Sequence, residues 1–222
     1  MEWFRSLRRT PSAVLLAVQL GGILIYPFLG ANGLGRALFG VLGVLVLGLA
    51  VYAVRATPAL SWVSVLLGVP VVVLTVLESV QPDVDGIVLA SAVTHAAFYY
   101  YTAYALIRYM FHDNVVTRDE IYATGATFTV VAWAFAYLYV AIQIIWPGSF
   151  TGVGEIDDRT WIELLHLSIA NLTGVGLTDV LPVRQHARSV VMLSQIVGML
   201  YIALVIARIM TLLAARAARR AG

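Results

Sequence analysis

The residues best suited to chemistry lie at positions 172–179, which read Leu-Thr-Gly-Val-Gly-Leu-Thr-Asp. In this stretch Gly174 and Gly176 alternate with residues that carry side chains. Because glycine adopts left-handed backbone conformations at little cost, the alternation lets successive carbonyl oxygens turn the same way. A row of carbonyls can replace the water around a cation inside a membrane. The stretch therefore predicts the lining of an ion pathway, which the rest of the chain must position.

The composition is that of an integral membrane protein. Of the 222 residues, 61% are hydrophobic and 12% are charged, whereas a soluble domain carries about 25% charged residues. Cysteine and lysine do not occur in the sequence, which excludes disulfides, thiolate metal sites and a lysine Schiff base. The net charge of +2 is too small to indicate a nucleic-acid partner. No nucleophile-and-base pattern or cofactor motif indicates an enzyme.

Apolar runs near the length needed to cross a bilayer, about 20 residues, predict six transmembrane helices. They cover residues 11–29, 35–54, 59–77, 86–107, 122–146 and 187–213. The expected fold is an all-α membrane protein with a re-entrant pore helix and filter loop between helices five and six. We expect residues 1–110 to form a four-helix N-terminal region and residues 111–222 to form a two-helix pore domain.

Residues 159–172 are too few and too polar to cross a bilayer, and they predict a helix that enters the membrane and turns back. Thr160 and Glu163 fit a capping box at its start; an ion-handling role is the alternative for Glu163. Non-helical backbone at membrane depth must be enclosed by protein or line a watery cavity. Within the re-entrant loop, residues 159–179, we therefore expect residues 173–179 to be enclosed, most simply by copies of the same chain.

The arginines predict the orientation in the membrane, because cytoplasmic loops carry an excess of basic residues. With six spans, the arginines of both termini lie on the same side as Arg55 and Arg108. Both termini are therefore expected in the cytoplasm, in a multi-pass protein of the plasma membrane. Arg216, Arg219 and Arg220 form a basic patch that would attract anionic lipid headgroups. The lack of lysine, with abundant alanine, valine and arginine, favours a prokaryotic source.

Residues 171–183 resemble the pore module of prokaryotic potassium channels; they read Asn-Leu-Thr-Gly-Val-Gly-Leu-Thr-Asp-Val-Leu-Pro-Val. The family pattern Thr-Thr-Val-Gly-Tyr-Gly-Asp aligns without a gap to residues 173–179, and Pro182 takes the place of the family's proline. The resemblance implies a homotetramer in which four re-entrant loops meet on an axis and bind potassium through their carbonyls. The filter would consist of Thr173, Gly174, Val175, Gly176, Leu177 and Thr178.

The same resemblance assigns roles to individual residues. Potassium or another monovalent cation is expected at Gly174, Val175 and Gly176. Gly198 stands where the inner helix of the family bends to open. Close packing against a neighbouring helix is the alternative for Gly198.

Three filter positions depart from the family pattern. Gly174 replaces a threonine and removes its hydroxyl, Leu177 replaces the tyrosine that braces the filter, and Thr178 replaces a glycine. A β-branched residue at positive φ is strained, so we expect the outer half of the loop to follow another backbone path. These departures predict a cation channel with relaxed potassium selectivity. A strictly potassium-selective channel with an unconventional filter is the alternative.

Asp179 and His166 are the expected supports of the filter. Asp179 matches the family's aspartate behind the filter, and His166 stands where the family often carries an aromatic residue that bonds to it. We therefore expect a contact between these two side chains. Because histidine titrates near neutral pH, the contact predicts conduction that depends on pH; a structural histidine is the alternative.

The first four helices carry no series of arginines at every third position, so we expect little gating charge. In the fourth helix, His95 and the tyrosines at 99–101 are interpreted as packing aromatics or as a buried polar site for a proton, lipid or small ligand. Glu78 is interpreted as a solvated acid at the end of the third helix.

A function of another class is an alternative to a channel. A small transporter can be built on broken helices with glycine-rich turns, and a non-conducting membrane sensor can share a channel-like fold. A transporter predicts an internal repeat, whereas the glycine-rich re-entrant unit occurs once in this sequence. A single such unit per chain favours closure by several copies.

Overall fold

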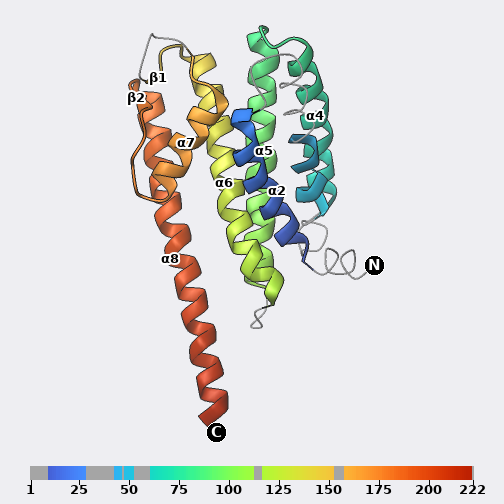
Figure 1. Cartoon of the computed structure of the whole chain (residues 1–222), viewed down its shortest axis with the longest axis vertical. Coiled ribbons are helices and arrows are strands. Elements are labelled where there is room, and N and C mark those ends of the chain that lie inside the picture. The colour runs from blue at the N-terminus through green and yellow to red at the C-terminus, as the bar shows by residue number, and fades with distance from the viewer. Residues whose placement is uncertain are drawn as a thin grey trace.

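The computed structural model describes residues 10–28, 43–46, 48–52, 61–112, 117–152 and 158–221 (Figure 1). Their helices are α2 (Pro11–Ile25), the 3-10 helix η1 (Tyr26–Phe28), α4 (Ser61–Val80), α5 (Asp85–Met110), α6 (Arg118–Ile145), α7 (Trp161–Leu172) and α8 (Gln185–Ala221). Two short strands, β1 (Phe150–Thr151) and β2 (Leu181–Pro182), pair antiparallel. The chain is therefore all-α apart from this one small ladder in the described part.

Four of the described helices are long enough and apolar enough to cross a membrane: Pro11–Phe28, Trp62–Val80, Asp119–Ile145 and Gln185–Thr211. α5 has 26 residues and thus a length of about 39 Å, but it is richer in polar side chains. The second predicted span, residues 35–54, lies partly outside the described residues; its residues 43–46 and 48–52 are helical. The prediction of a helical membrane protein is confirmed at this level.

α6 is the central helix of the fold and packs against α2, α5, α7 and α8. Small side chains make this possible, since they let neighbouring backbones approach closely inside a membrane. Five alanines of α6 are completely buried: Ala123, Ala126, Ala132, Ala134 and Ala136. Trp133 and Tyr139, which are among the largest fully buried side chains, lie on the same helix. The core of the chain therefore surrounds α6.

α2 is fixed to α6 by polar contacts as well as by packing. The Asp119 carboxylate accepts hydrogen bonds from the backbone N–H of Ser12 at 3.0 Å and from its hydroxyl at 2.9 Å. This arrangement caps the start of α2, where N–H groups lack helical partners and favour a negative charge. Farther along, the Thr129 hydroxyl donates to Gln19 Oε1 at 2.7 Å.

The two ends of the bundle differ, and we name them as they lie in Figure 1. The upper end holds the α4–α5 turn, β1 and β2. The lower end holds Asp119 and Phe111, and there the guanidinium carbon of Arg208 on α8 lies 5.3 Å from the Phe111 ring centroid. Figure 1 shows that α8 continues below the other helices.

Candidate ion-pathway site

The start of α7 is fixed by the capping box expected from the sequence. The Thr160 hydroxyl oxygen accepts from the Glu163 N–H at 3.5 Å, and the Glu163 carboxylate accepts from the Thr160 N–H at 2.6 Å. Arg159 Nη1 lies 3.7 Å from the other carboxylate oxygen. The prediction of a capped helix is thus confirmed, and this role occupies the Glu163 carboxylate.

α6 holds the same end of α7 through one amide side chain. The Gln143 amide donates to the Arg159 carbonyl at 2.9 Å and accepts from the Arg159 N–H at 3.0 Å. Deeper in the bundle, the Ser168 hydroxyl donates to the Ala132 carbonyl at 2.8 Å. Both contacts are buried, so the direction of α7 is set by α6.

The chain around α7 leaves the upper end of the bundle and returns to it. Phe150 pairs with Pro182 and Thr151 with Leu181, so the two limbs of the segment meet at β1 and β2. The Val183 N–H extends this contact by donating to the Ser149 carbonyl at 2.9 Å. α7 and the loop that follows it therefore form one hairpin, tied at its open end.

The glycine-containing loop after α7 has the alternating backbone that its sequence suggests. Gly174 has φ +74° and Gly176 has φ +69°, which side chains disfavour. The Gly174 N–H donates to the Asn171 carbonyl at 3.1 Å, and the Gly176 N–H donates to the Ala170 carbonyl at 2.9 Å. These bonds fold the loop back against the end of α7.

The outer half of the loop avoids the strain expected at Thr178. Among the described residues only glycines have positive φ, so Thr178 follows a backbone path open to side chains. Its hydroxyl accepts from the Val180 N–H at 3.1 Å, and Val180 is completely buried. This short turn anchors the end of the loop.

The remaining filter residues point in different directions. The Thr173 hydroxyl donates to the Ile169 carbonyl at 2.8 Å, so it stays with the helix. Val175 and Leu177 are 63% and 76% exposed in the single chain. Both side chains therefore project from the surface of the single chain.

His166 and Asp179 meet as expected. His166 Nδ1 lies 3.7 Å from Asp179 Oδ1, and their side chains are 56% and 53% exposed. The pair therefore links α7 to the end of the loop at the surface of the chain. Its role as a filter support stays a prediction.

A cavity of 370 Å³ lies beneath the loop, at the C-terminal end of α7. Its lining is neutral and consists of Ala170, Asn171, Leu172, Thr173, Gly174, Gly176, Gln195, Met199 and Ile202. The C-terminal end of a helix carries a partial negative charge that favours cations. The neutral cavity therefore lies at the negative end of the α7 helix dipole.

Two polar residues of this cavity were not singled out from the sequence. The Gln195 amide donates to Asn171 Oδ1 at 2.7 Å, and the Asn171 amide donates to the Leu167 carbonyl at 2.8 Å. Together they tie α8 to the end of α7. The available signal was a single glutamine in the apolar run of the last helix, one turn before Gly198.

α8 comes very close to the end of α7 at Gly198. A Cβ at this position would lie 2.6 Å from the Leu172 Cα and would collide with the Leu172 carbonyl group. Nearby, the Tyr139 hydroxyl donates to the Ser194 hydroxyl at 2.8 Å. Close packing, the alternative considered for Gly198, is therefore observed; a role as gating hinge stays a prediction.

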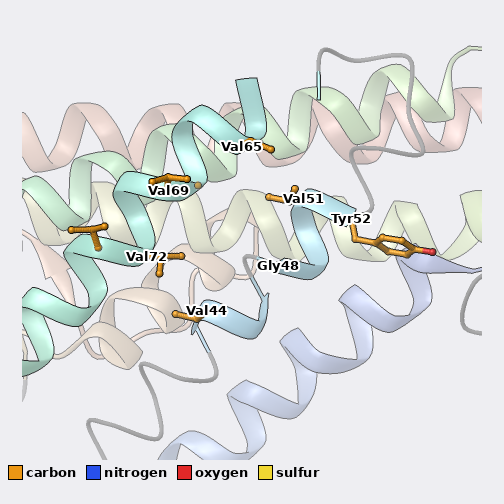
Figure 2. Close-up of a pocket in the computed structure, with 9 residues that line it drawn as sticks. Val44, Gly48, Val51, Tyr52, Val65, Val69 and Val72 are labelled. Carbon is orange, nitrogen blue, oxygen red and sulfur yellow. The ribbon is translucent and has the colours of Figure 1, made fainter. Parts of the chain in front are cut away.

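A second pocket, of 550 Å³, lies between the helical residues 43–52 and α4. Figure 2 shows Val44, Gly48 and Val51 on one wall and Val65 and Val69 on the other. The lining is apolar except for the Tyr52 hydroxyl. The lining residues that the structure describes therefore include no charged or amide side chain.

The N-terminal helices hold a polar cluster that corrects one interpretation. Glu78 is half-buried, and the Ser91 side chain is its hydrogen-bond partner; Glu78 is therefore not a freely solvated acid. His95 is 2% exposed. The side chains of Arg216, Arg219 and Arg220, proposed to contact lipid, lie outside the described part of the structure.

Comparison of this chain with protein-family models, with curated proteins and with solved structures finds no match. The assignment of a function therefore depends on the geometry of the site itself.

Proposed function

We propose that the chain is the subunit of a homotetrameric channel for monovalent cations, with residues 173–178 lining the ion pathway. In this proposal the chain crosses the membrane six times, and α7 with its loop re-enters from the upper end. Both termini lie in the cytoplasm, so the upper end faces outward. The basic residues Arg216, Arg219 and Arg220 lie near the inner headgroups.

One observation carries the proposal. A helix of 12 residues is followed by a loop whose glycines at 174 and 176 have positive φ, and β1 and β2 return this segment to the end where it began. A short helix and an open loop held in this way direct backbone groups, rather than side chains, toward an ion. Carbonyl groups are the ligands that a dehydrated monovalent cation needs.

The surface that a single chain leaves uncovered supports assembly from several copies. Val175, Leu177 and Met199 are each more than 60% exposed, and the cavity beneath the loop has walls from only one α7 and one α8. Non-helical backbone at membrane depth must be enclosed. Copies of the same chain around an axis provide that enclosure.

Relaxed selectivity for potassium is the expected property of this filter. Gly174 offers no hydroxyl at the inner end of the loop, and the exposed Leu177 has no polar group with which to brace the loop against α7. Selective coordination requires a fixed number of carbonyls at a fixed spacing. A loop with fewer braces holds that spacing less tightly and admits sodium more readily.

The decisive test is the reversal potential of the purified protein in a planar bilayer, with potassium on one side and sodium on the other. Unitary currents that reverse near zero are expected. Currents that reverse near the potassium equilibrium potential would show a selective filter built from an unusual sequence. Silence across voltage, pH and lipid composition would reject conduction and favour a sensor or transporter.

Restoring the family residues tests the alignment of the filter. Gly174→Thr, Leu177→Tyr and Thr178→Gly together should shift the reversal potential toward that of potassium. Gly68→Ala on α4 is a matched control, because its Cβ would meet only ordinary contacts, 3.5 Å from Phe98. Equal reversal potentials in the triple variant and the wild type would contradict the alignment.

Assembly is tested by cross-linking, for which a chain without cysteine is well suited. Leu177→Cys should form disulfide-linked dimers on mild oxidation in the membrane, because copies of residue 177 approach one another around the axis. Val69→Cys, 60% exposed on α4, should form far fewer. Equal cross-linking at both positions would argue against an axis at the loop.

A further inference from the structure

The inner end of α7 is bonded to α8 through a pair of amide side chains. Asn171 is 5% exposed, and its Nδ2 donates to the Leu167 carbonyl oxygen at 2.8 Å. Because that oxygen can only accept, the flipped orientation of the Asn171 amide is excluded and its Oδ1 is left to accept. Gln195 Nε2 donates to this oxygen at 2.7 Å. The Asn171 amide is therefore held at both of its polar atoms.

The backbone of the glycine-containing loop is bonded to the same end of α7. The Gly174 N–H donates to the carbonyl oxygen of Asn171 itself at 3.1 Å, and the Gly176 N–H donates to the Ala170 carbonyl oxygen at 2.9 Å. Asn171 thus accepts from α8 through its side chain and from the loop through its backbone. A displacement of this end of α7 relative to α8 therefore displaces both glycines.

The distance between α7 and α8 is limited in both directions at this point. At Gly198 the two backbones are so close that an added Cβ would lie 2.6 Å from the Leu172 Cα, so the helices cannot approach further. About one turn earlier on α8, the hydrogen bond from Gln195 to Asn171 opposes their separation. The packed glycine and the amide bond together fix the gap between the two helices.

The outer side of the loop has no comparable bond to another helix. Leu177 is 76% exposed and carries no polar group. His166 Nδ1 and Asp179 Oδ1 lie 3.7 Å apart, beyond the length of a hydrogen bond. Among the described residues, the bond from Gln195 is the only side-chain hydrogen bond that reaches residues 170–178 from another helix. The position of the loop therefore depends on this bond.

We propose that Gln195 is a positioning residue of the ion pathway and determines the largest cation that passes. By holding Asn171, it keeps Gly174 and Gly176 at a fixed distance from α8, so that the loop carbonyls cannot move apart. Potassium and the smaller sodium ion fit between them, whereas ammonium ions that carry methyl groups do not. This inference rests on the proposed channel function.

The first test measures the loop itself and does not require conduction. Gln195→Leu keeps a side chain of similar size beside the cavity but leaves the buried Asn171 Oδ1 without its donor. The protein is placed in lipid nanodiscs, and hydrogen exchange of the Gly174 and Gly176 amides is followed by NMR. Exchange should become about fivefold faster or more, because a buried acceptor that loses its donor destabilises the structure around it.

The second test measures permeation by size. The reversal potential in a planar bilayer, with potassium on one side and methylammonium on the other, gives the ratio of their permeabilities. Methylammonium should be nearly impermeant in the wild type. In Gln195→Leu the loop can move away from its fixed position, so the relative permeability of methylammonium should rise several-fold and the reversal potential should shift toward zero.

Two further variants make both tests specific. Asn171→Leu breaks the same bond from the other helix and leaves Gln195 beside the cavity, so it should act as Gln195→Leu does, and the double variant should add little. It also serves if one of the single variants fails to fold. Tyr139→Phe is the matched control: it removes the bond from α6 to Ser194, the neighbour of Gln195 on α8, and should change neither exchange nor permeability.

The outcomes separate this inference from the channel proposal. Unchanged exchange in Gln195→Leu, or equal changes in Tyr139→Phe, would overturn the positioning role. A wild type that passes methylammonium as freely as potassium, or an effect on permeability of Gln195→Leu without one of Asn171→Leu, would overturn the control of size through Asn171. A chain that conducts nothing but shows the faster exchange would reject the channel and keep Gln195 as the residue that positions the loop.

Discussion

α6 and α8 have apolar spans of equal length but opposite surroundings. Both candidate spans have 27 residues. In the most apolar part of the α6 span 67% of the residues are buried within the chain, against 22% in that of the α8 span. α6 is surrounded by helices of its own chain, whereas α8 is held by α7 and by a few contacts with α6. The comparison shows that a single chain completes the packing around α6. It leaves most of the surface of α8, the helix next to the loop, exposed to other molecules.

The largest expected effect is a difference in stability between two glycine-to-alanine variants, each of which places a methyl group at a close helix contact. Gly198→Ala on α8 drives a Cβ into the backbone of Leu172 and should destabilise the protein by about 1–3 kcal/mol. Gly125→Ala on α6 meets only the side chain of Leu16. Its nearest methyl group, at 2.9 Å, can rotate away. Alanine's helix preference of roughly 1 kcal/mol should then leave this variant near neutral.

Thermal unfolding in detergent, followed by circular dichroism, measures both glycine variants. If both variants lost the same stability, the contrast between the helices would be wrong. α8 would then tolerate a side chain at residue 198 as well as α6 tolerates one at residue 125. A Gly198→Ala protein that is destabilised but conducts normally would also argue against a hinge at this position.

A smaller effect is expected at the helix caps. Thr160→Ala removes the reciprocal capping box of α7 and should cost about 1 kcal/mol, seen as faster hydrogen exchange in the first turn of α7. Thr117→Ala removes a single bond, from the Glu120 N–H at 3.2 Å, at the start of α6. Since α6 is held by packing along its length, hydrogen exchange in its first turn should change less than in α7. A larger change in α6 than in α7 would contradict this reasoning.

The smallest expected effect is the difference in stability between phenylalanine variants of two buried tyrosines. Tyr139→Phe removes the hydrogen bond from α6 to Ser194 on α8 and should cost about 0.6 kcal/mol, the usual size of such bonds in membranes. The Tyr99 hydroxyl has no hydrogen-bond partner among the described residues, so Tyr99→Phe should be neutral or slightly stabilising. Chemical unfolding of both variants in one detergent compares them; a larger loss at Tyr99 would show an unseen partner.

The sequence predicted the features that local chemistry determines. The apolar runs located α2, α4, α5 and α6 within a few residues, whereas α8 continues to Ala221, beyond its predicted end at residue 213. The Thr160–Glu163 spacing located the start of α7, because a cap depends only on residues within one turn. The His166–Asp179 contact followed from a resemblance that fixes which residues lie across the loop. The two glycines indicated the backbone of residues 174–176 for the same local reason.

What sequence reasoning missed depends on the rotation of one helix against another. Glu78 was interpreted as solvated because its position at the end of an apolar run says nothing about Ser91 on the next helix. The Gln195–Asn171 bond likewise joins two helices whose facing sides are set by packing. The close approach at Gly198 was foreseen only as an alternative, since a glycine in a helix is compatible with both a bend and a contact.

The contacts of α2 also fix an order of assembly. Its two buried polar ties, Ser12 to Asp119 and Gln19 to Thr129, join residues 107 and 110 positions apart, and both end on α6. By contrast, the ties that hold α7 join Gln143 to Arg159 and Ser168 to Ala132, only 16 and 36 positions apart. Nearby segments meet sooner than distant ones. α2 must therefore wait, with Gln19 lacking its Thr129 partner, until α6 has been made.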